Sequence, residues 1–378
     1  MSAEGLSRTC VAICLAVFLA NCGGGEGSSD GPATPLSPPP SPTPPPPPAP
    51  LPPPAPDFSA IEDELAAFAI NDVTVLIGDE SGVLFTYERG AISAQTPVNA
   101  GSAAKLVFGL LAWDLVEAEV LSSSDNPQNY LDFWTQVEPG GRGGVTFENL
   151  FSLVSGFNNP PQTAGCIGDT SFTLLDCVEQ IHDGELDTLP GKALYYGPEH
   201  MQVAAAMIEA ATGEEINTLL NDRLVSRFGL SGDTAYPDAG NTRYAGAIVS
   251  TASDYGRLLE AVLDGRLVSD RDAFLTNRTA GLFIGFRPAA VELNMFDWRY
   301  AFGFWKECDL TSYQPECDEN PTISSPGGFG FTPWIDFDAG YWGVIAIEQT
   351  PGFGANPSQQ SVALEQALQP LIEAAIAE

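Results

Sequence analysis

The sequence predicts an α/β (α+β) fold with two lobes: an antiparallel sheet flanked by helices, and a mostly helical lobe. Stretches rich in strand-forming residues occur near both ends of the folded part of the chain, and helical patterns fill the region between them. Strands from the two ends can bury their apolar faces by sharing one sheet, while the middle packs as a second lobe. A binding site is expected in the cleft between the lobes.

The first elements of the folded part are a helix and a hairpin. Residues 58–70 have apolar residues at helical spacing, and two short runs of strand-forming residues follow at 73–77 and 83–87. Turn-forming residues at 79–82 separate the runs, so an antiparallel hairpin is predicted. Residues 102–121 are then predicted to form a long apolar helix.

The middle of the chain, from about residue 125 to about residue 290, carries mostly helix and loop signals. Thr251 and Asp254 have the form of a capping box ahead of an amphipathic run to Leu263, which predicts a helix start. The ranges 300–305, 332–338 and 341–348 are rich in strand-forming residues. Residues 361–376 are predicted to form a closing amphipathic helix.

The N-terminus is typical of a targeting segment. An apolar run at 9–20 follows Arg8 and is too short to span a bilayer, so residues 1–21 are predicted to be a signal peptide. Its end resembles a bacterial lipoprotein signal, which implies lipidation of Cys22; an ordinary secretory signal is the alternative. We expect export and anchoring to a membrane, and Gly23 favours the outer membrane, facing the periplasm or the cell surface.

Residues 22–56 are predicted to be a disordered, extended linker between this anchor and a folded domain at 57–378. The range 32–56 contains half of the 32 prolines of the chain, so it lacks the apolar side chains that a core requires. The chain carries 49 acidic against 15 basic residues, a net charge of −34, which excludes nucleic acid as a partner and disfavours strongly anionic substrates and surfaces. The scarcity of lysine favours adaptation to a salty medium as the origin of this charge.

Four cysteines fall into two local pairs, Cys166 with Cys177 and Cys308 with Cys317. Disulfides persist in exported proteins, so two short loop-closing bridges are predicted. No metal site is expected, because the pairs lack C-x-x-C spacing and the chain has only two histidines, His182 and His200. Both histidines are expected to be solvated.

The strongest chemical signal is Ser102-Ala-Ala-Lys105. Residues three apart at the start of a helix lie on one face, so the hydroxyl and the amine can contact each other. A serine hydroxyl needs a base to take its proton, and a lysine can serve once burial lowers its pKa. The apolar residues that follow Lys105 would supply that burial.

In this pattern the chain resembles the serine β-lactamase and penicillin-binding protein superfamily, which includes DD-peptidases and class C-like esterases and has a β-lactamase/transpeptidase-like fold. The shared features are the S-x-x-K motif, the hairpin before it, the run Asn149 to Gly156 and the helix entry after Val249. The resemblance implies that Ser102 is the nucleophile and that Lys105 activates it, without a cofactor.

Two further family motifs are matched with departures. The tyrosine motif Y-x-N resembles Tyr196-Gly-Pro198, which implies that Tyr196 relays the proton; Tyr195 is the alternative, and Pro198 replaces the asparagine. The third motif resembles Ser325-Pro-Gly327, without the family's cation. The resemblance places Ser325, Gly327 and Gly328 at the substrate and the oxyanion, with the Gly328 amide as a donor.

These features predict a serine hydrolase that forms an acyl-enzyme with a small ester or amide substrate. The departures at Pro198 and Ser325 favour carboxylic esters and predict weak binding of β-lactams. A β-lactamase, a D-amino-acid peptidase and a non-catalytic penicillin-binding-like sensor remain the alternatives, together with a structural surface protein that retains only the scaffold.

Overall fold

The computed structural model describes Gly31 and residues 56–134, 141–157, 165–186, 188–237, 240–308, 310–352 and 356–377. The chain divides into two units, Met1–Pro53 and Pro54–Glu378, and all the helices and strands that follow belong to the second. The predicted signal peptide, the lipidation of Cys22 and nearly all of the linker lie outside the described residues. Within the described ranges, no helix has both the length and the apolar character needed to cross a membrane.

One sheet joins the two ends of the folded unit, as the sequence predicts. Its seven strands run antiparallel in the order β2-β1-β11-β10-β9-β8-β7. The strands are β1 (Val73–Asp79), β2 (Gly82–Arg89), β7 (Arg299–Tyr300), β8 (Trp305–Lys306), β9 (Thr322–Ser324), β10 (Thr332–Asp336) and β11 (Tyr341–Ala346). The N-terminal hairpin therefore pairs directly with the last strand, β11.

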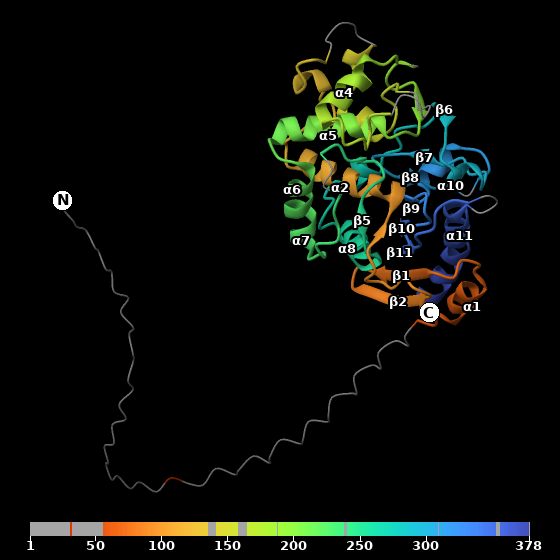
Figure 1. Cartoon of the computed structure of the whole chain (residues 1–378). Coiled ribbons are helices and arrows are strands. Elements are labelled where there is room, and N and C mark those ends of the chain that lie inside the picture. The colour runs from red at the N-terminus through yellow and green to blue at the C-terminus, as the bar shows by residue number, and fades with distance from the viewer. Residues whose placement is uncertain are drawn as a thin grey trace. The chain divides into compact units, whose positions relative to one another are not determined.

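Helices cover both faces of this sheet, as Figure 1 shows. On one face, α1 (Ser59–Ala67) and α11 (Pro357–Ile376) pack against alternate residues of β1 such as Val75 and Ile77. On the other face, α8 (Ala252–Leu263) and α2 (Ala104–Glu117) share a core with Leu76 of the same strand. The alternation follows from the two-residue period of a strand, which sends neighbouring side chains to opposite faces.

The helical lobe, yellow and green in Figure 1, lies on the α2 side of the sheet. Its helices are α3 (Phe147–Phe151), α4 (Leu174–Asp183), α5 (Glu199–Thr212), α6 (Ile216–Leu220) and α7 (Ser226–Phe228). Two short helices, α9 (Arg271–Leu275) and α10 (Ala289–Glu292), follow α8 in the chain, and α10 packs against α11. Short strands bind the helical lobe together: β3 (Val98–Asn99) pairs with β5 (Val249–Ser250), and β4 (Ala193–Tyr195) pairs with β6 (Phe283–Phe286). The N-cap Thr251 accepts a hydrogen bond from the Asp254 N–H, at the predicted start of α8.

Three details differ from the sequence prediction. The range 300–305 contains parts of two strands, β7 and β8, with a turn between them where Gly303 has a φ of 91°. Strand β9 was not predicted, because three residues are too short a run for a clear alternation. The helix predicted at 102–121 begins with a 3₁₀ turn, η1 (Gly101–Ala103), and α2 ends at Glu117.

Candidate active site

Ser102 lies in the η1 turn directly before α2 and is half-buried. The turn starts at Gly101, whose φ of 56° is in the left-handed region that favours glycine. A Cβ on Gly101 would come within 3.0 Å of the Gly328 amide nitrogen, so the glycine also allows the chain after β9 to approach the serine closely. The Asn99 side chain accepts a 2.8 Å hydrogen bond from the Gly101 N–H and holds this turn in place.

Lys105 is buried one helical turn after the serine, with only 3% of its surface exposed. Its Nζ lies 3.1 Å from Ser102 Oγ and donates a 2.8 Å hydrogen bond to the Ala245 carbonyl. Burial, reinforced by the positive charge of Arg243 and opposed by Glu199, lowers the pKa of Lys105 from 10.5 to about 7. At neutral pH Lys105 is therefore uncharged in a large share of the molecules, and its uncharged amine can accept a proton.

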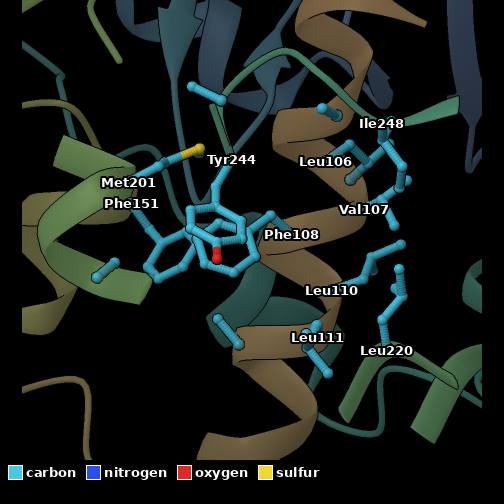
Figure 2. Packing of buried hydrophobic residues seen from close by; sticks show 14 of the residues in the cluster. Leu106, Val107, Phe108, Leu110, Leu111, Phe151, Met201, Leu220, Tyr244 and Ile248 are labelled. Carbon is cyan, nitrogen blue, oxygen red and sulfur yellow. The ribbon is translucent and has the colours of Figure 1, made fainter. Parts of the chain in front are cut away.

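Helix α2 creates this environment because it is apolar on all sides. Figure 2 shows Leu106, Val107, Leu110 and Leu111 in contact with the surrounding core, and Phe108 beside Phe151 and Tyr244. A helix that is apolar all round is buried rather than amphipathic. The amine of Lys105 therefore lies at the edge of a core, where water cannot stabilise its charged form.

Tyr196 follows strand β4 and lies next to the lysine. The Lys105 Nζ is 4.4 Å from the centre of its ring, and the ring stacks on Trp305 of β8 with centroids 5.6 Å apart. Burial raises the pKa of Tyr196 well above 10, although its hydrogen bond with Ser102 acts in the opposite direction. The phenol therefore keeps its proton. Tyr195 instead packs its ring on Gly285 of β6. Of the two tyrosines considered for the proton relay, Tyr196 is therefore the one that lines the cavity with Ser102 and Lys105.

His200 corrects the expectation of a solvated histidine. It is fully buried in the first turn of α5, with Nδ1 2.6 Å from Ser155 Oγ and Nε2 2.9 Å from the Tyr195 carbonyl. Burial, with a smaller effect of Lys105, lowers the pKa of His200 to about 3, so the ring is neutral. Nε2–H then donates to Tyr195, and Ser155 donates to Nδ1. His182 is also partly buried, between Phe133 and Trp134.

The residues of the third motif differ in their exposure near Ser102. Gly328 is exposed and lines the cavity in front of the serine, whereas Ser325 and Gly327 are buried behind it. The Gly327 N–H donates to the Phe331 carbonyl, and the Ser325 hydroxyl donates a long 3.4 Å bond to the Ser102 carbonyl. Within the described residues the Gly328 N–H has no acceptor, and the Ser102 N–H lies in a first helical turn, which offers none.

A cavity of about 350 Å³ opens in front of Ser102, Lys105 and Tyr196. Its other walls come from the segment that contains Arg243, Ala245 and Gly246, from Phe286 at the end of β6 and Pro288 after it, and from Gly328 and Phe329. Sequence reasoning missed Arg243 and Ala245. Ala245 acts through its backbone carbonyl, which leaves no trace in the residue type, and Arg243 stands outside the matched motifs.

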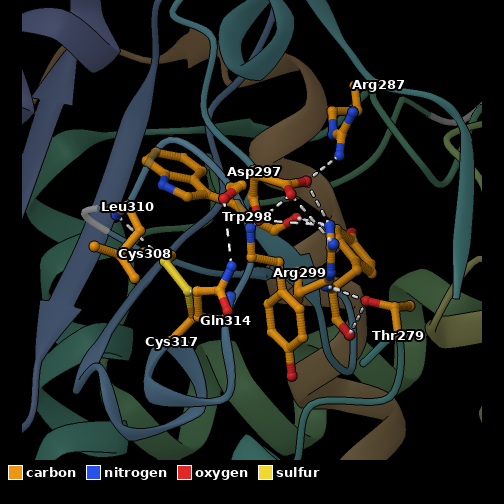
Figure 3. Close-up of polar contacts among 12 residues, drawn as sticks. Thr279, Arg287, Asp297, Trp298, Arg299, Cys308, Leu310, Gln314 and Cys317 are labelled. Carbon is orange, nitrogen blue, oxygen red and sulfur yellow. Dashed lines mark hydrogen bonds and ion pairs between the residues drawn. A yellow bond between two sulfur atoms is a disulfide. The ribbon is translucent and has the colours of Figure 1, made fainter. Parts of the chain in front are cut away.

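Both predicted disulfides are present, and each is buried in a hydrophobic cluster. Cys166–Cys177 and Cys308–Cys317 have Cα separations of 5.4 Å and 4.9 Å. Figure 3 shows the second bridge beside Asp297, which contacts both Arg287 and Arg299. In the described ranges, no group of three or more His, Cys, Asp or Glu side chains is arranged to hold a metal ion.

The model of the beta-lactamase family matches residues 58–367, which include every element of this site. The chain belongs to the beta-lactamase family. Its fold is the β-lactamase/transpeptidase-like fold, and its relatives are serine hydrolases. The comparison with curated proteins found no match to this chain.

Solved structures that share this family member's fold have different activities. A protein from Bacteroides dorei assigned as a β-lactamase has a TM-score of 0.67 at 20% identity, covering 85% of this chain and 100% of that one. EstCE1, a hydrolase with promiscuous acyltransferase activity, has a TM-score of 0.64 at 16% identity, covering 81% and 96%. A D-stereospecific amidohydrolase from Streptomyces has a TM-score of 0.59 at 17% identity, covering 82% and 98%. At these identities the likeness concerns the fold alone.

Proposed function

We propose that this member of the beta-lactamase family is a serine hydrolase that forms an acyl-enzyme and acts on carboxylic esters. The 3.1 Å approach of Lys105 Nζ to Ser102 Oγ supports the proposal most strongly. A nucleophile needs a base within hydrogen-bond reach, and that base must be uncharged at the working pH. Lys105 meets both conditions because its pKa is lowered to about 7.

In the proposed first step, Ser102 Oγ attacks the ester carbonyl while Lys105 Nζ takes the hydroxyl proton. The negative charge that develops on the carbonyl oxygen is stabilised by the N–H groups of Ser102 and Gly328. When the tetrahedral intermediate collapses, the C–O bond to the alcohol breaks, and the proton passes from Lys105 through the Tyr196 phenol to the leaving oxygen. Water repeats the sequence in the second step and releases the acid.

Two departures from the family motifs favour an ester over an amide or a β-lactam. Pro198 offers no side-chain amide to hold a substrate amide, and Ser325-Pro326 offers no cation at the third motif. An alcohol leaves more readily than an amine, so an ester needs less assistance from an acid. Phe286 and Phe329 give the cavity apolar walls for the organic parts of a small ester.

A substrate comparison under matched salt tests the proposal. Short-chain p-nitrophenyl esters should turn over repeatedly, faster than a chromogenic cephalosporin or a D-alanyl-D-alanine peptide, and Ser102→Ala should abolish turnover. Faster cleavage of the cephalosporin or the peptide would reassign the substrate class. Labelling of Ser102 by a serine-reactive probe without turnover of any substrate would favour the sensor, and absence of labelling would overturn the proposal.

The cellular location is a second proposal, which depends on the N-terminal sequence alone. We propose that Cys22 is lipidated and holds the exported domain at the outer membrane. Cells supplied with a labelled fatty acid should label the protein, and Cys22→Ser should release it into the soluble fraction. Labelling that survives Cys22→Ser would contradict this anchor.

A further inference from the structure

We infer that Arg243 binds a carboxylate carried by the substrate, so that the preferred esters have an anionic group on their acyl or alcohol part. Arg243 is exposed on the wall of the Ser102 cavity, and its guanidinium has no partner among the residues that the structure describes. The inference rests on the function proposed above and names the substrate class of that same site.

Arg243 is the exception among the arginines of this chain. Within the described residues its side chain has no hydrogen bond, ion pair or ring contact. Every other described arginine donates at least one hydrogen bond to a carboxylate or a carbonyl. The chain holds 49 acidic residues for 15 basic ones, so an exposed arginine with no acidic partner in the described ranges is unexpected. A free guanidinium in a cavity keeps its five donors available for a ligand.

The backbone on both sides of Arg243 is held by buried contacts. Gln202 of α5 donates to the Asn241 side chain at 2.8 Å and to the Thr242 carbonyl at 3.0 Å. Tyr244 stacks on Phe108 of α2, with ring centres 5.6 Å apart, as Figure 2 shows. Its carbonyl accepts a 2.9 Å hydrogen bond from the Tyr236 hydroxyl. The segment therefore presents Arg243 from a fixed frame, which lowers the entropy cost of binding.

The same frame places Arg243 beside the reacting groups. The Ala245 carbonyl, two residues later, accepts the hydrogen bond from Lys105. A Cβ on Gly246 would lie 3.7 Å from Arg243 Cδ and 3.9 Å from the Gly101 carbonyl carbon, so the arginine stem and the residue before Ser102 both lie close to Gly246. A substrate that is acylated on Ser102 can therefore reach the guanidinium with a short extension.

A carboxylate is the group that suits this position best. Guanidinium and carboxylate groups pair through two parallel hydrogen bonds, an arrangement that a lysine cannot provide. The net charge of −34 disfavours anionic substrates at long range, but salt screens that repulsion more than it screens a contact inside a cavity. The location also differs from the third motif, where Ser325-Pro326 offers no cation.

The test compares two p-nitrophenyl esters of similar length, the monoester of glutaric acid and the ester of pentanoic acid. The quantity measured is the ratio of kcat/KM for the anionic ester to kcat/KM for the neutral one. The pH should lie two units above the pKa of Lys105, which is about 7, because the charge of Arg243 also affects that pKa. Arg243→Gln should lower the ratio about 10- to 100-fold, and Arg243→Lys should lower it less.

Lys192→Gln is the matched control, because it removes an exposed cation that does not line the cavity and should leave the ratio unchanged. If Arg243→Gln leaves the ratio unchanged while the esters still turn over, the inference is wrong and the proposed function stands. If no ester turns over, the proposed function fails, and calorimetry with monomethyl glutarate decides the inference separately. Binding by the wild type that is lost in Arg243→Gln would support it, and equal binding would overturn it.

Discussion

The molecule buries a cation in two regions, Arg299 in one and Lys105 in the other, and the two cations have different partners. In the cluster of Figure 3, Arg299 is 8% exposed and its Nη1 lies 2.7 Å from Asp297 Oδ1. Beside the cavity, Lys105 is 3% exposed, and its Nζ contacts a hydroxyl, a carbonyl and an aromatic ring within the described part of the chain. One buried cation has a carboxylate in contact and the other does not.

The difference separates a structural cation from a reactive one. Partial burial alone would raise the pKa of Asp297, but the Tyr313 N–H and then Arg299 and Arg287 outweigh it and lower the pKa, so the cluster stays ionised. Burial, with the charge of Arg243, lowers the pKa of Lys105 to about 7, because the opposing effect of Glu199 is smaller than the lost hydration. Desolvation acts on the cations of both regions. Pairing with Asp297 compensates it for Arg299, whereas for Lys105 it lowers the pKa and leaves an amine that can act as a base.

The largest effect is expected from replacing the reactive cation. Lys105→Met keeps an unbranched side chain but removes the base, so ester kcat/KM should fall by about 10³-fold or more. Pre-steady-state assays should show that acylation of Ser102 slows with it. Acylation that stays within a few-fold of the wild type would show that another group takes the proton.

The same substitution in the other region should act on stability instead. Arg299→Met removes one partner of the half-buried Asp297 and should lower the free energy of unfolding by about 2–3 kcal/mol, as measured by urea denaturation. Lys105→Met should raise the free energy of unfolding at pH 7, because it removes an uncompensated buried amine. Destabilisation by both substitutions would contradict the contrast between the regions.

The effect that is smallest for one unit of pH is a pH dependence of stability that belongs to Lys105 alone. Between pH 7 and pH 10.5 the unfolded chain binds a proton at Lys105 that the folded protein does not bind. The stability of the wild type relative to Lys105→Met should therefore rise with pH in this window, by about 1.4 kcal/mol per unit. A difference that does not change with pH would mean that the folded pKa of Lys105 is ordinary.

Much of the fold could be predicted because its strongest patterns are local. The hairpin at β1 and β2, the apolar run of α2 and the capping threonine of α8 are each visible within a few residues. Strand β9 and the split of residues 300–305 into two strands could not be predicted, because runs of two or three residues are too short to show an alternation. That strands from both ends of the folded unit share one sheet could be predicted, because both sets of strands must bury their apolar faces.

The site was predictable where side chains follow a motif. Ser102, Lys105 and Tyr196 line one cavity, as the motifs imply. The sequence does not reveal that Ala245 anchors Lys105, since any residue has a carbonyl. It also gave no reason to bury His200, whose ring fits between Ser155 and the Tyr195 carbonyl only in the folded chain. Arg243 lies at the cavity because its neighbours Thr242 and Tyr244 contact residues that are distant in the sequence, and a local pattern cannot predict such contacts.

A direct titration of the lysine amines tests whether burial leaves Lys105 uncharged at neutral pH. The chain contains three lysines, Lys105, Lys192 and Lys306, so lysine-selective ¹³C labelling gives a simple NMR spectrum, and Lys105→Met assigns the signal of interest. We predict that the Cε signal of Lys105 titrates with a pKa of about 7. A Lys105 signal that titrates near 10.5, the value of a solvated lysine, would contradict the account of how Ser102 is activated.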